Sequence, residues 1–185
     1  MRLTDLDHYT RQLLDVSRFR DHCPNGLQVE GKSTLNRIVT GVTASLELLE
    51  AAIEDGADAI LVHHGYFWKN EPATIVGVKR GRIKLLLAHD VSLFGFHLPL
   101  DAHPELGNNA QLGLRRGLTA DARFGAQSLG FAGPAGEHRS VQALAARVQT
   151  ALGGRAPLVL LGDGRPLARI GWCSGGAQGY FEAAI

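Results

Sequence analysis

The segment from residue 36 to residue 64 constrains the fold more than any other part of the chain. It runs from the β-branched stretch NRIVTGVTA, through SLELLEAAIEDGA with its helical spacing of apolar residues, to the apolar stretch ADAILVHH. Ser45 is a suitable N-cap for the helix, and Gly56 is suited to end it. A strand, a helix and a strand in this order predict two parallel strands joined by a right-handed crossover.

The following segment repeats this pattern and extends the predicted sheet. VKRGRIKLLLAHD predicts a helix, and residues 91–97 predict a strand. Upstream, residues 3–16 predict a helix with Thr4 as its cap, and PNG at residues 24–26 predicts a turn. Residues 108–118 also have helical spacing. The fold class is therefore α/β, with a mostly parallel sheet flanked by helices.

The character of the sequence changes near residue 120, where a Gly- and Ala-rich stretch without clear periodicity begins. We place a metal-site α/β domain at 1–120 and a second, smaller α/β region at 125–185. SVQALAARVQTALGG predicts a helix capped by Ser140, PLVLLGD and ARIGWCSGG predict strands, and GAQGYFEAAI begins a helix. That last helix has no end signal, so we expect the second region to be incomplete at its C-terminal end.

Composition limits the function classes. A net charge of +1 argues against a dedicated nucleic-acid binder, although a local basic patch remains open. Cys23 and Cys173 fit neither a disulfide framework nor a CxxC metal site, and they are expected to be small buried side chains. The chain starts without a secretory apolar region and has no stretch of membrane-spanning length. The expectation is a soluble cytoplasmic protein with no membrane partner.

Histidines and a carboxylate follow two predicted strands and suggest a divalent-metal site. His63 and His64 end one strand, and His97, Asp101 and His103 follow the next. The carboxyl ends of parallel strands share one edge of a sheet, so these side chains should meet there. Neighbouring strand residues point to opposite faces, so His63 and His64 converge on one ion only if the backbone bends at Gly65. Otherwise each binds its own ion in a two-metal site.

Asp101 suits a bridging role between two ions, but three ligands are too few for two ions. His97, waters or residues beyond the end of the chain would complete the shells. The alternative is that His63 and His64 form a satisfied pair at a strand end without metal.

Three neighbouring groups each allow two interpretations. The basic run could bind phosphate or be a solvated helix face; it comprises Lys79, Arg80, Arg82 and Lys84. The aromatic run could stack on a base or pack an oligomer interface; it comprises Tyr66, Phe67 and Trp68. Asn108 and Asn109 could support the metal ligands or cap a helix.

Four segments together carry a family resemblance: PNGLQVEG, IVTGVTAS, GADAILVHHGYFWK and HLPLDAHPELGNNAQL. In them the chain resembles the Nif-three-like family of dinuclear metal proteins, in its bacterial YbgI-type branch, often labelled GTP cyclohydrolase type 2 homologs. The resemblance implies that His63, His64 and Asp101 ligate two divalent ions (zinc, iron or manganese) and that His97 lines the site, which makes it the catalytic candidate. It also implies a later histidine and glutamate that complete the site, and no matching pair follows residue 138.

Two functions are compatible with this resemblance. The first is a metal-dependent hydrolase that acts on a nucleotide or related substrate, as a GTP cyclohydrolase would. The second is a non-enzymatic, toroidal binding or regulatory protein for nucleic acid or protein. The resemblance implies a homohexamer, and we expect Phe67, Trp68 and Leu98 to be exposed apolar side chains that such an assembly covers.

Overall fold

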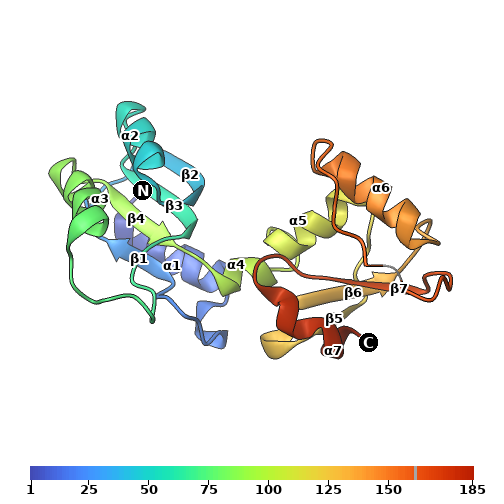
Figure 1. The fold of residues 1–185 in the computed structure, drawn as a ribbon. Helices are drawn as coiled ribbons and strands as arrows, with labels where there is room; N and C mark the ends of the chain where they lie inside the picture. The colour runs from blue at the N-terminus through green and yellow to red at the C-terminus, as the bar shows by residue number, and fades with distance from the viewer. Residues whose placement is uncertain (161) are drawn as a thin grey trace. The chain divides into compact units, whose positions relative to one another are not determined.

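The computed structural model describes residues 1–160 and 162–185. These residues form two compact units, Met1–Leu100 and Asp101–Ile185 (Figure 1). The division falls inside the short helix α4 (Leu98–Ala102), whereas the sequence suggested a boundary near residue 120. The difference arises because the segment after α4 packs with the later strands: Gly113 lies against the Trp172 ring, and Leu118 shares a core with Ile170.

Within its described residues, the first unit has a four-stranded sheet in the order β1-β4-β3-β2. β2, β3 and β4 run parallel to one another, which confirms the predicted parallel neighbours, and β1 is antiparallel to β4. The sequence analysis did not predict β1, because the strand has only four residues and the first of them, Gly26, belongs to the predicted PNG turn. The strands are β1 (Gly26–Val29), β2 (Ile38–Thr43), β3 (Ala59–His64) and β4 (Ser92–Gly95).

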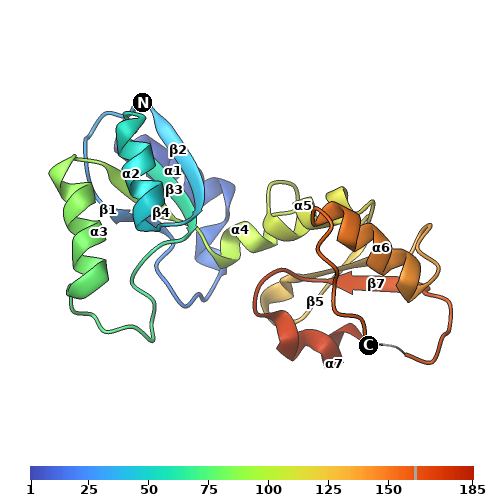
Figure 2. The same cartoon turned by 45° about the horizontal axis from the view of Figure 1, so that its top comes forward.

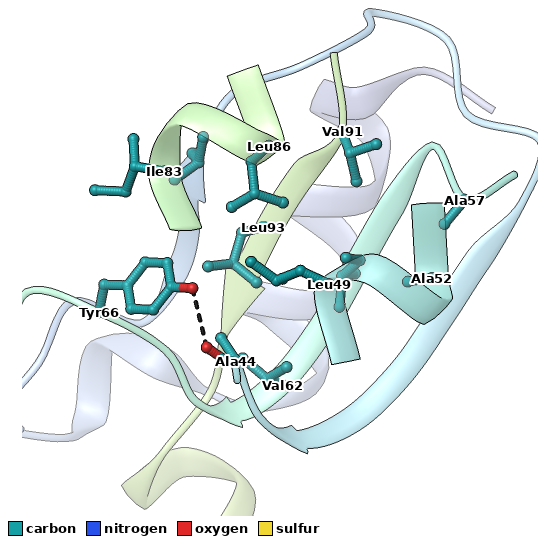
Figure 3. Close-up of a cluster of buried hydrophobic side chains, with 12 residues drawn as sticks. Ala44, Leu49, Ala52, Ala57, Val62, Tyr66, Ile83, Leu86, Val91 and Leu93 are labelled. Carbon is teal, nitrogen blue, oxygen red and sulfur yellow. Dashed lines mark hydrogen bonds between the residues drawn. The ribbon is translucent and has the colours of Figure 1, made fainter. Parts of the chain in front are cut away.

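Helices cover both faces of this sheet. Because strand side chains alternate between faces, Ile60 and Val62 pack with α2 and α3, whereas Ala59 packs with α1. The Tyr66 ring completes the α2/α3 side, and its hydroxyl donates a hydrogen bond of 3.0 Å to the carbonyl of Ala44 (Figure 3). The helices are α1 (Leu3–Leu13), the 3-10 turn η1 (Val16–Arg18), α2 (Leu46–Glu54) and α3 (Gly77–Ala88) (Figure 2).

The helix starts test two predicted caps. Ser45 caps α2 as predicted, with its Oγ accepting a hydrogen bond from the Leu48 N–H at 3.3 Å. The predicted Thr4 cap is wrong, because α1 already begins at Leu3. The earlier start follows from pairing at the chain terminus, where the Leu3 N–H donates to the carbonyl of Ser33 at 2.9 Å.

Within its described residues, the second unit has a three-stranded antiparallel sheet in the order β5-β6-β7. The helix predicted after Ser140 is confirmed as α6, with the Ser140 Oγ accepting from the Ala143 N–H. β5 and β6 were missed because their Gly- and Ala-rich sequence carries little periodicity. The elements are β5 (Ala122–Phe124), β6 (Gly130–Pro134), β7 (Arg169–Trp172), α5 (Asn108–Arg115), α6 (Val141–Ala151), α7 (Phe181–Ala184) and the 3-10 turns η2 (Ala126–Ser128) and η3 (Ala177–Tyr180).

One predicted strand and one predicted surface are wrong. Residues 157–160 and 162–163 are not in a strand, and residue 161 lies outside the described residues. Leu158 and Leu160 are 90% and 81% exposed, so their apolar run has no sheet to pack on. Phe67, Trp68 and Leu98, expected to be exposed, are half-buried. Phe67 packs against the hydrophobic core of the first unit, and the Trp68 ring lies against the His97 ring. No helix of the described residues is both long and apolar enough to cross a membrane.

Candidate metal centre

Three histidines gather at the carboxyl edge of the parallel strands. His63 and His64 end β3, and His97 follows the end of β4. Each offers one nitrogen, and these nitrogens lie within 4.8 Å of one another. The ring centroids of His63 and His64 are 4.4 Å apart, and those of His63 and His97 are 5.0 Å apart. The rings of the two adjacent histidines thus lie together. They can do so because β3 ends at His64 and the chain leaves the sheet at Gly65.

The Nδ1 atoms of His63 and His64 face groups of the neighbouring strands. The His63 Nδ1 lies 3.0 Å from the carbonyl oxygen of Phe96. A carbonyl only accepts hydrogen bonds, so His63 carries its proton on Nδ1, and Nε2 is the nitrogen suited to a metal. The His64 Nδ1 lies 3.2 Å from the Thr43 Oγ1. Partners of this kind orient metal-binding imidazoles.

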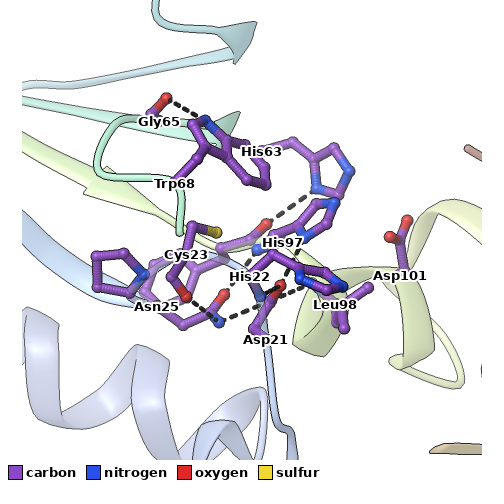
Figure 4. A network of polar contacts seen from close by, with 12 residues as sticks. Asp21, His22, Cys23, Asn25, His63, Gly65, Trp68, His97, Leu98 and Asp101 are labelled. Carbon is purple, nitrogen blue, oxygen red and sulfur yellow. Dashed lines mark hydrogen bonds and ion pairs between the residues drawn. The ribbon is translucent and has the colours of Figure 1, made fainter. Parts of the chain in front are cut away.

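His97 is held on two sides (Figure 4). Its Nδ1 lies 2.8 Å from Asp21 Oδ1, and the Trp68 ring meets it edge-on with the centroids 4.9 Å apart. Trp68 is itself anchored, because its Nε1 donates to the carbonyl of Gly65 at 3.2 Å. A carboxylate behind an imidazole is the usual support of a metal-binding histidine.

Asp21 and Asn25 form the polar base under His97, and sequence reasoning missed both roles. Burial acts to raise the pKa of Asp21, but hydrogen bonds from His97, Asn25 and the backbone N–H groups of Leu98 and His22 outweigh it and lower the pKa to about 2. Asp21 is therefore ionised at neutral pH. The sequence around Asn25 predicts only a turn, and no local pattern connects DHCPN to a histidine so distant in sequence.

Gln28 ties the loops of the site together. Its Oε1 accepts a hydrogen bond from the Tyr66 N–H at 2.7 Å, and its Nε2 donates to the carbonyl of Pro24 at 2.8 Å. A Cβ at Gly65 would collide with the Gln28 amide, and a Cβ at Gly95 would come within 2.6 Å of its Nε2. A side chain at either position would have to displace the Gln28 amide from the place in which it makes these hydrogen bonds.

Asp101 belongs to the second unit, where it is 8% exposed. Its Oδ1 accepts hydrogen bonds from the Asn108 Nδ2 at 2.9 Å and the Ser174 Oγ at 3.1 Å. Asn108 therefore supports Asp101, and it does not cap α5, whose N-cap is Gly107. No sequence pattern had pointed to Ser174. The meeting of Asp101 with His63 and His64 stays a prediction.

Comparison with known proteins identifies the family of the chain. The sequence profile of Duf34/NIF3 (NGG1p interacting factor 3) matches residues 1–185. The chain belongs to the DUF34/NIF3 family. Within this family, the chain is 49% identical over 177 residues to a Neisseria meningitidis serogroup B protein named "GTP cyclohydrolase 1 type 2 homolog", covering 96% of this chain and 71% of that protein. An Escherichia coli K12 protein of the same name is 46% identical over 192 residues, covering 100% of this chain and 74% of the relative.

Solved structures of similar proteins confirm the α/β fold. A structure titled "Structural genomics, protein ybgI, unknown function" superposes with a TM-score of 0.89 at 47% identity and covers 98% of this chain and 73% of that chain. The protein TTHA1606 from Thermus thermophilus superposes with a TM-score of 0.77 at 31% identity, covering 98% of this chain and 74% of that chain. Both likenesses extend over nearly the whole of this DUF34/NIF3 chain.

A second group of possible ligands in this DUF34/NIF3 chain comprises Asp21, Cys23 and His97. Cys23 is 8% exposed, as the sequence suggested for a small buried side chain. Burial, followed by the nearby Asp21 charge, raises the pKa of the Cys23 thiol to about 12. Metals bind the thiolate, so this environment disfavours Cys23 as a ligand. Cys173 is only half-buried, and burial raises the pKa of its thiol as well.

The aromatic and basic runs divide among several roles. Tyr66 is buried in the core and cannot stack on a base, whereas Trp68 contacts His97. Lys79 Nζ donates to the carbonyl of Pro72 at 2.8 Å and lies 5.8 Å from the centre of the Phe67 ring. Lys79 thus stabilises the loop before α3. His103 has a local role too, since its Nδ1 accepts from the backbone N–H of Leu106 at 3.0 Å.

Proposed function

We propose that the chain binds divalent metal at the cluster of His63, His64 and His97 and acts as a metal-dependent hydrolase on a nucleotide-like substrate. The observation that carries the proposal is the convergence of the three imidazoles within 4.8 Å, two of them supported at Nδ1 by an acceptor. Imidazole nitrogens suit zinc and iron. The name shared by the relatives, "GTP cyclohydrolase 1 type 2 homolog", supports a nucleotide as the substrate class.

The residues present fit such a centre and its chemistry. A divalent ion held there would lower the pKa of a water and polarise the substrate. His63 and His64 would hold the ion. His97, with Asp21 hydrogen-bonded to Nδ1, would either join them or accept a proton from the water at Nε2. The edge of Trp68 would shield His97 from bulk water.

Metal content separates this proposal from a structural histidine pair. The purified chain is loaded with Zn²⁺ or Mn²⁺, freed of excess ion and measured by elemental analysis, beside His63→Ala, His64→Ala and His8→Ala. His8 is exposed on α1 and outside the cluster, so His8→Ala should keep the metal of the unaltered protein. The two site variants should lose most of it. Equal metal in all four proteins would contradict the proposal.

Turnover tests the hydrolase step. GTP and other nucleotides are incubated with metal-loaded and chelator-treated protein, and products are followed by chromatography. We expect turnover that needs metal and falls by about 10²–10⁴-fold in His97→Ala if His97 is the general base. Metal binding without turnover of any nucleotide would favour the non-enzymatic alternative.

A second ion and the ligand role of Asp101 are a finer part of the proposal. Asp101→Ala should lower the metal content further than Ser174→Ala, which removes one hydrogen-bond donor and leaves the carboxylate in place. Asp101→Ala with the full metal content of the unaltered chain would exclude Asp101 as a ligand. The candidate ions are zinc, iron and manganese.

The non-enzymatic alternative also draws on the family. The family takes its name from an "NGG1p interacting factor", which favours a binding role for at least one member. We propose on this basis, and on the resemblance, that the chain forms a homo-oligomer. A protein or nucleic-acid partner would then bind the assembly independently of turnover.

A further inference from the structure

We propose that Asp21 is a positioning residue of the candidate metal centre, which fixes the tautomer and the ring orientation of His97 so that Nε2 is the reactive nitrogen. The inference deepens the proposed function and rests on it for its effect on metal binding. It concerns a residue from the DHCPN loop, far from the histidine-bearing strands in sequence.

Four donors surround the Asp21 carboxylate. Oδ1 accepts from the His97 Nδ1 at 2.8 Å and the His22 N–H at 2.6 Å. Oδ2 accepts from the Asn25 Nδ2 and the Leu98 N–H, each at 2.8 Å. An ionised carboxylate has about four acceptor positions, so these bonds use its capacity. The His97 ring must therefore present a proton at Nδ1, which leaves Nε2 unprotonated in the neutral ring.

The same loop also fixes the backbone of His97. The Asn25 Oδ1 accepts a hydrogen bond from the His97 N–H at 2.7 Å, while its Nδ2 donates to Asp21. Asp21 holds the next backbone N–H, that of Leu98. The ring, its own backbone and the following peptide are thus anchored to one pair of side chains. This arrangement removes the rotational freedom that an imidazole after a strand end would otherwise have.

A direct ligand role for Asp21 fits this arrangement less well. The Asp21 side chain is only 3% exposed, compared with 18% for the side chain of His97. An ion on Asp21 would have to displace at least one of four hydrogen bonds that anchor His97 and its neighbours. The geometry favours Asp21 as a support behind the imidazole, the arrangement known for metal-binding histidines.

The tautomer of His97 in the unaltered, metal-free protein is the first test. Imidazole ¹⁵N NMR is recorded at about pH 8, where neutral histidine predominates, with His97→Gln to assign the signals. We expect His97 to carry its proton on Nδ1. A His97 that carries its proton on Nε2, or that shows both tautomers equally, overturns the inference. This measurement needs neither metal nor substrate, so it is independent of the proposed function.

The second test replaces Asp21 by Asn. The NH₂ group of the new amide would face hydrogen-bond donors in either orientation of the side chain. It would face His97 and His22 in one orientation, and Asn25 and Leu98 in the other. The orientation that turns the NH₂ group toward His97 favours the tautomer of His97 with its proton on Nε2. We expect the Nδ1–H signal of His97 to weaken and the Zn²⁺ affinity to fall about 10–100-fold. Asp58→Asn is the matched control, because it alters another buried, hydrogen-bonded carboxylate of the same unit whose bonds go to Lys32, Asn36 and Arg37.

The outcomes are distinguishable. An affinity loss of the same size in Asp58→Asn and Asp21→Asn, with an unchanged His97 tautomer, would show a merely structural role and overturn the inference. If Asp21→Asn does not fold, the tautomer of the unaltered protein still decides the inference. Absence of Zn²⁺ binding in the unaltered protein contradicts the proposed function, while the tautomer experiment still tests Asp21 separately.

Discussion

Among single residues, Asp58 shows how one carboxylate organises the backbone around it. Its oxygens accept from the Asn36 N–H at 2.8 Å, the Arg37 N–H at 3.1 Å and the Lys32 Nζ at 2.9 Å. It thereby ties the turn before β2 to the start of β3. The backbone hydrogen bond from Asn36, then Lys32, and then the backbone of Arg37 lower the pKa of Asp58 to about 2.

Asp58→Asn should reduce the free energy of unfolding by about 2 kcal/mol, because hydrogen bonds to a charged group are lost or weakened. Urea unfolding followed by circular dichroism measures this change. Asp55→Asn is the control, since Asp55 pairs with Arg37 where the two side chains are 54% and 59% exposed. That change should cost less than about 1 kcal/mol. Equal losses in the two variants would disprove the structural role of Asp58.

The same carboxylate predicts a pH dependence. The pKa of Asp58 is about 2 in the folded chain and lies near ~3.9 in an unfolded one. Its contribution is therefore complete above the unfolded value and is lost as pH falls from about 4 toward about 2. Urea midpoints measured across this range should fall more steeply for the unaltered protein than for Asp58→Asn. Parallel curves would contradict the assignment.

The residue scale also shows where sequence reasoning reached its limit. His63, His64 and His97 stood out because local strand patterns placed them at strand ends. Asp21 and Gln28 act through partners tens of residues away, so nothing in their own neighbourhood shows their roles. A contact of this kind depends on how strands are ordered in the sheet, and β1 was not predicted at all.

At the scale of elements, helices with local signals were predicted well and short strands poorly. α2 and α6 each have a serine cap and regular apolar spacing, which are properties of one segment. β5 has three residues and β6 includes Gly130 and Gly133, so these strands depend on pairing with distant partners. The predicted strand at 157–163 shows the converse, because its described residues, 157–160 and 162–163, pair with no neighbouring strand.

Gly81 offers a test of helix energetics in α3. It lies in the interior of the helix, and a Cβ there would meet nothing within 4 Å. Gly81→Ala should therefore raise the free energy of unfolding by about 0.5–1 kcal/mol. Thermal or urea unfolding measures the gain.

Gly31→Ala is the matched control for Gly81→Ala. The added Cβ at residue 31 would collide with the backbone carbonyl of Asp90, which no side-chain rotation relieves. We expect Gly31→Ala to destabilise the chain by about 1–3 kcal/mol, as overpacking does. A stabilised Gly31→Ala, or a destabilised Gly81→Ala, would contradict this use of the local geometry.

On the scale of the whole molecule, the α/β class and the family resemblance followed from the sequence and are confirmed. The predicted extent of the metal-site segment, 1–120, differs from the compact unit Met1–Leu100. Sequence composition changes near residue 120, but packing assigns α5 to the later sheet through Gly113 and Trp172. The amino-acid composition therefore changes at a different point of the chain from the one at which packing contacts divide the two compact units.

Assembly is the prediction at this scale. Ile75, Val76 and Val78 are 49%, 64% and 70% exposed at the start of α3, a grouping that an interface could cover. We expect light scattering to give the mass of a homo-oligomer, with six copies implied by the family resemblance. Measurements at two protein concentrations that differ about tenfold test whether the molecular mass depends on concentration, as it does in a reversible assembly. A monomer mass at both concentrations would contradict the expectation.

Gln28 has a consequence for how this sequence can change over evolutionary time. Its amide fills the space in which Gly65 and Gly95 would otherwise carry side chains. A side chain at either glycine would displace the Gln28 amide, and a displaced amide or a shorter residue 28 abandons the Tyr66 N–H. Substitutions at positions 28, 65 and 95 are therefore coupled. Among distant descendants of this sequence, we expect the three to be retained together or replaced together.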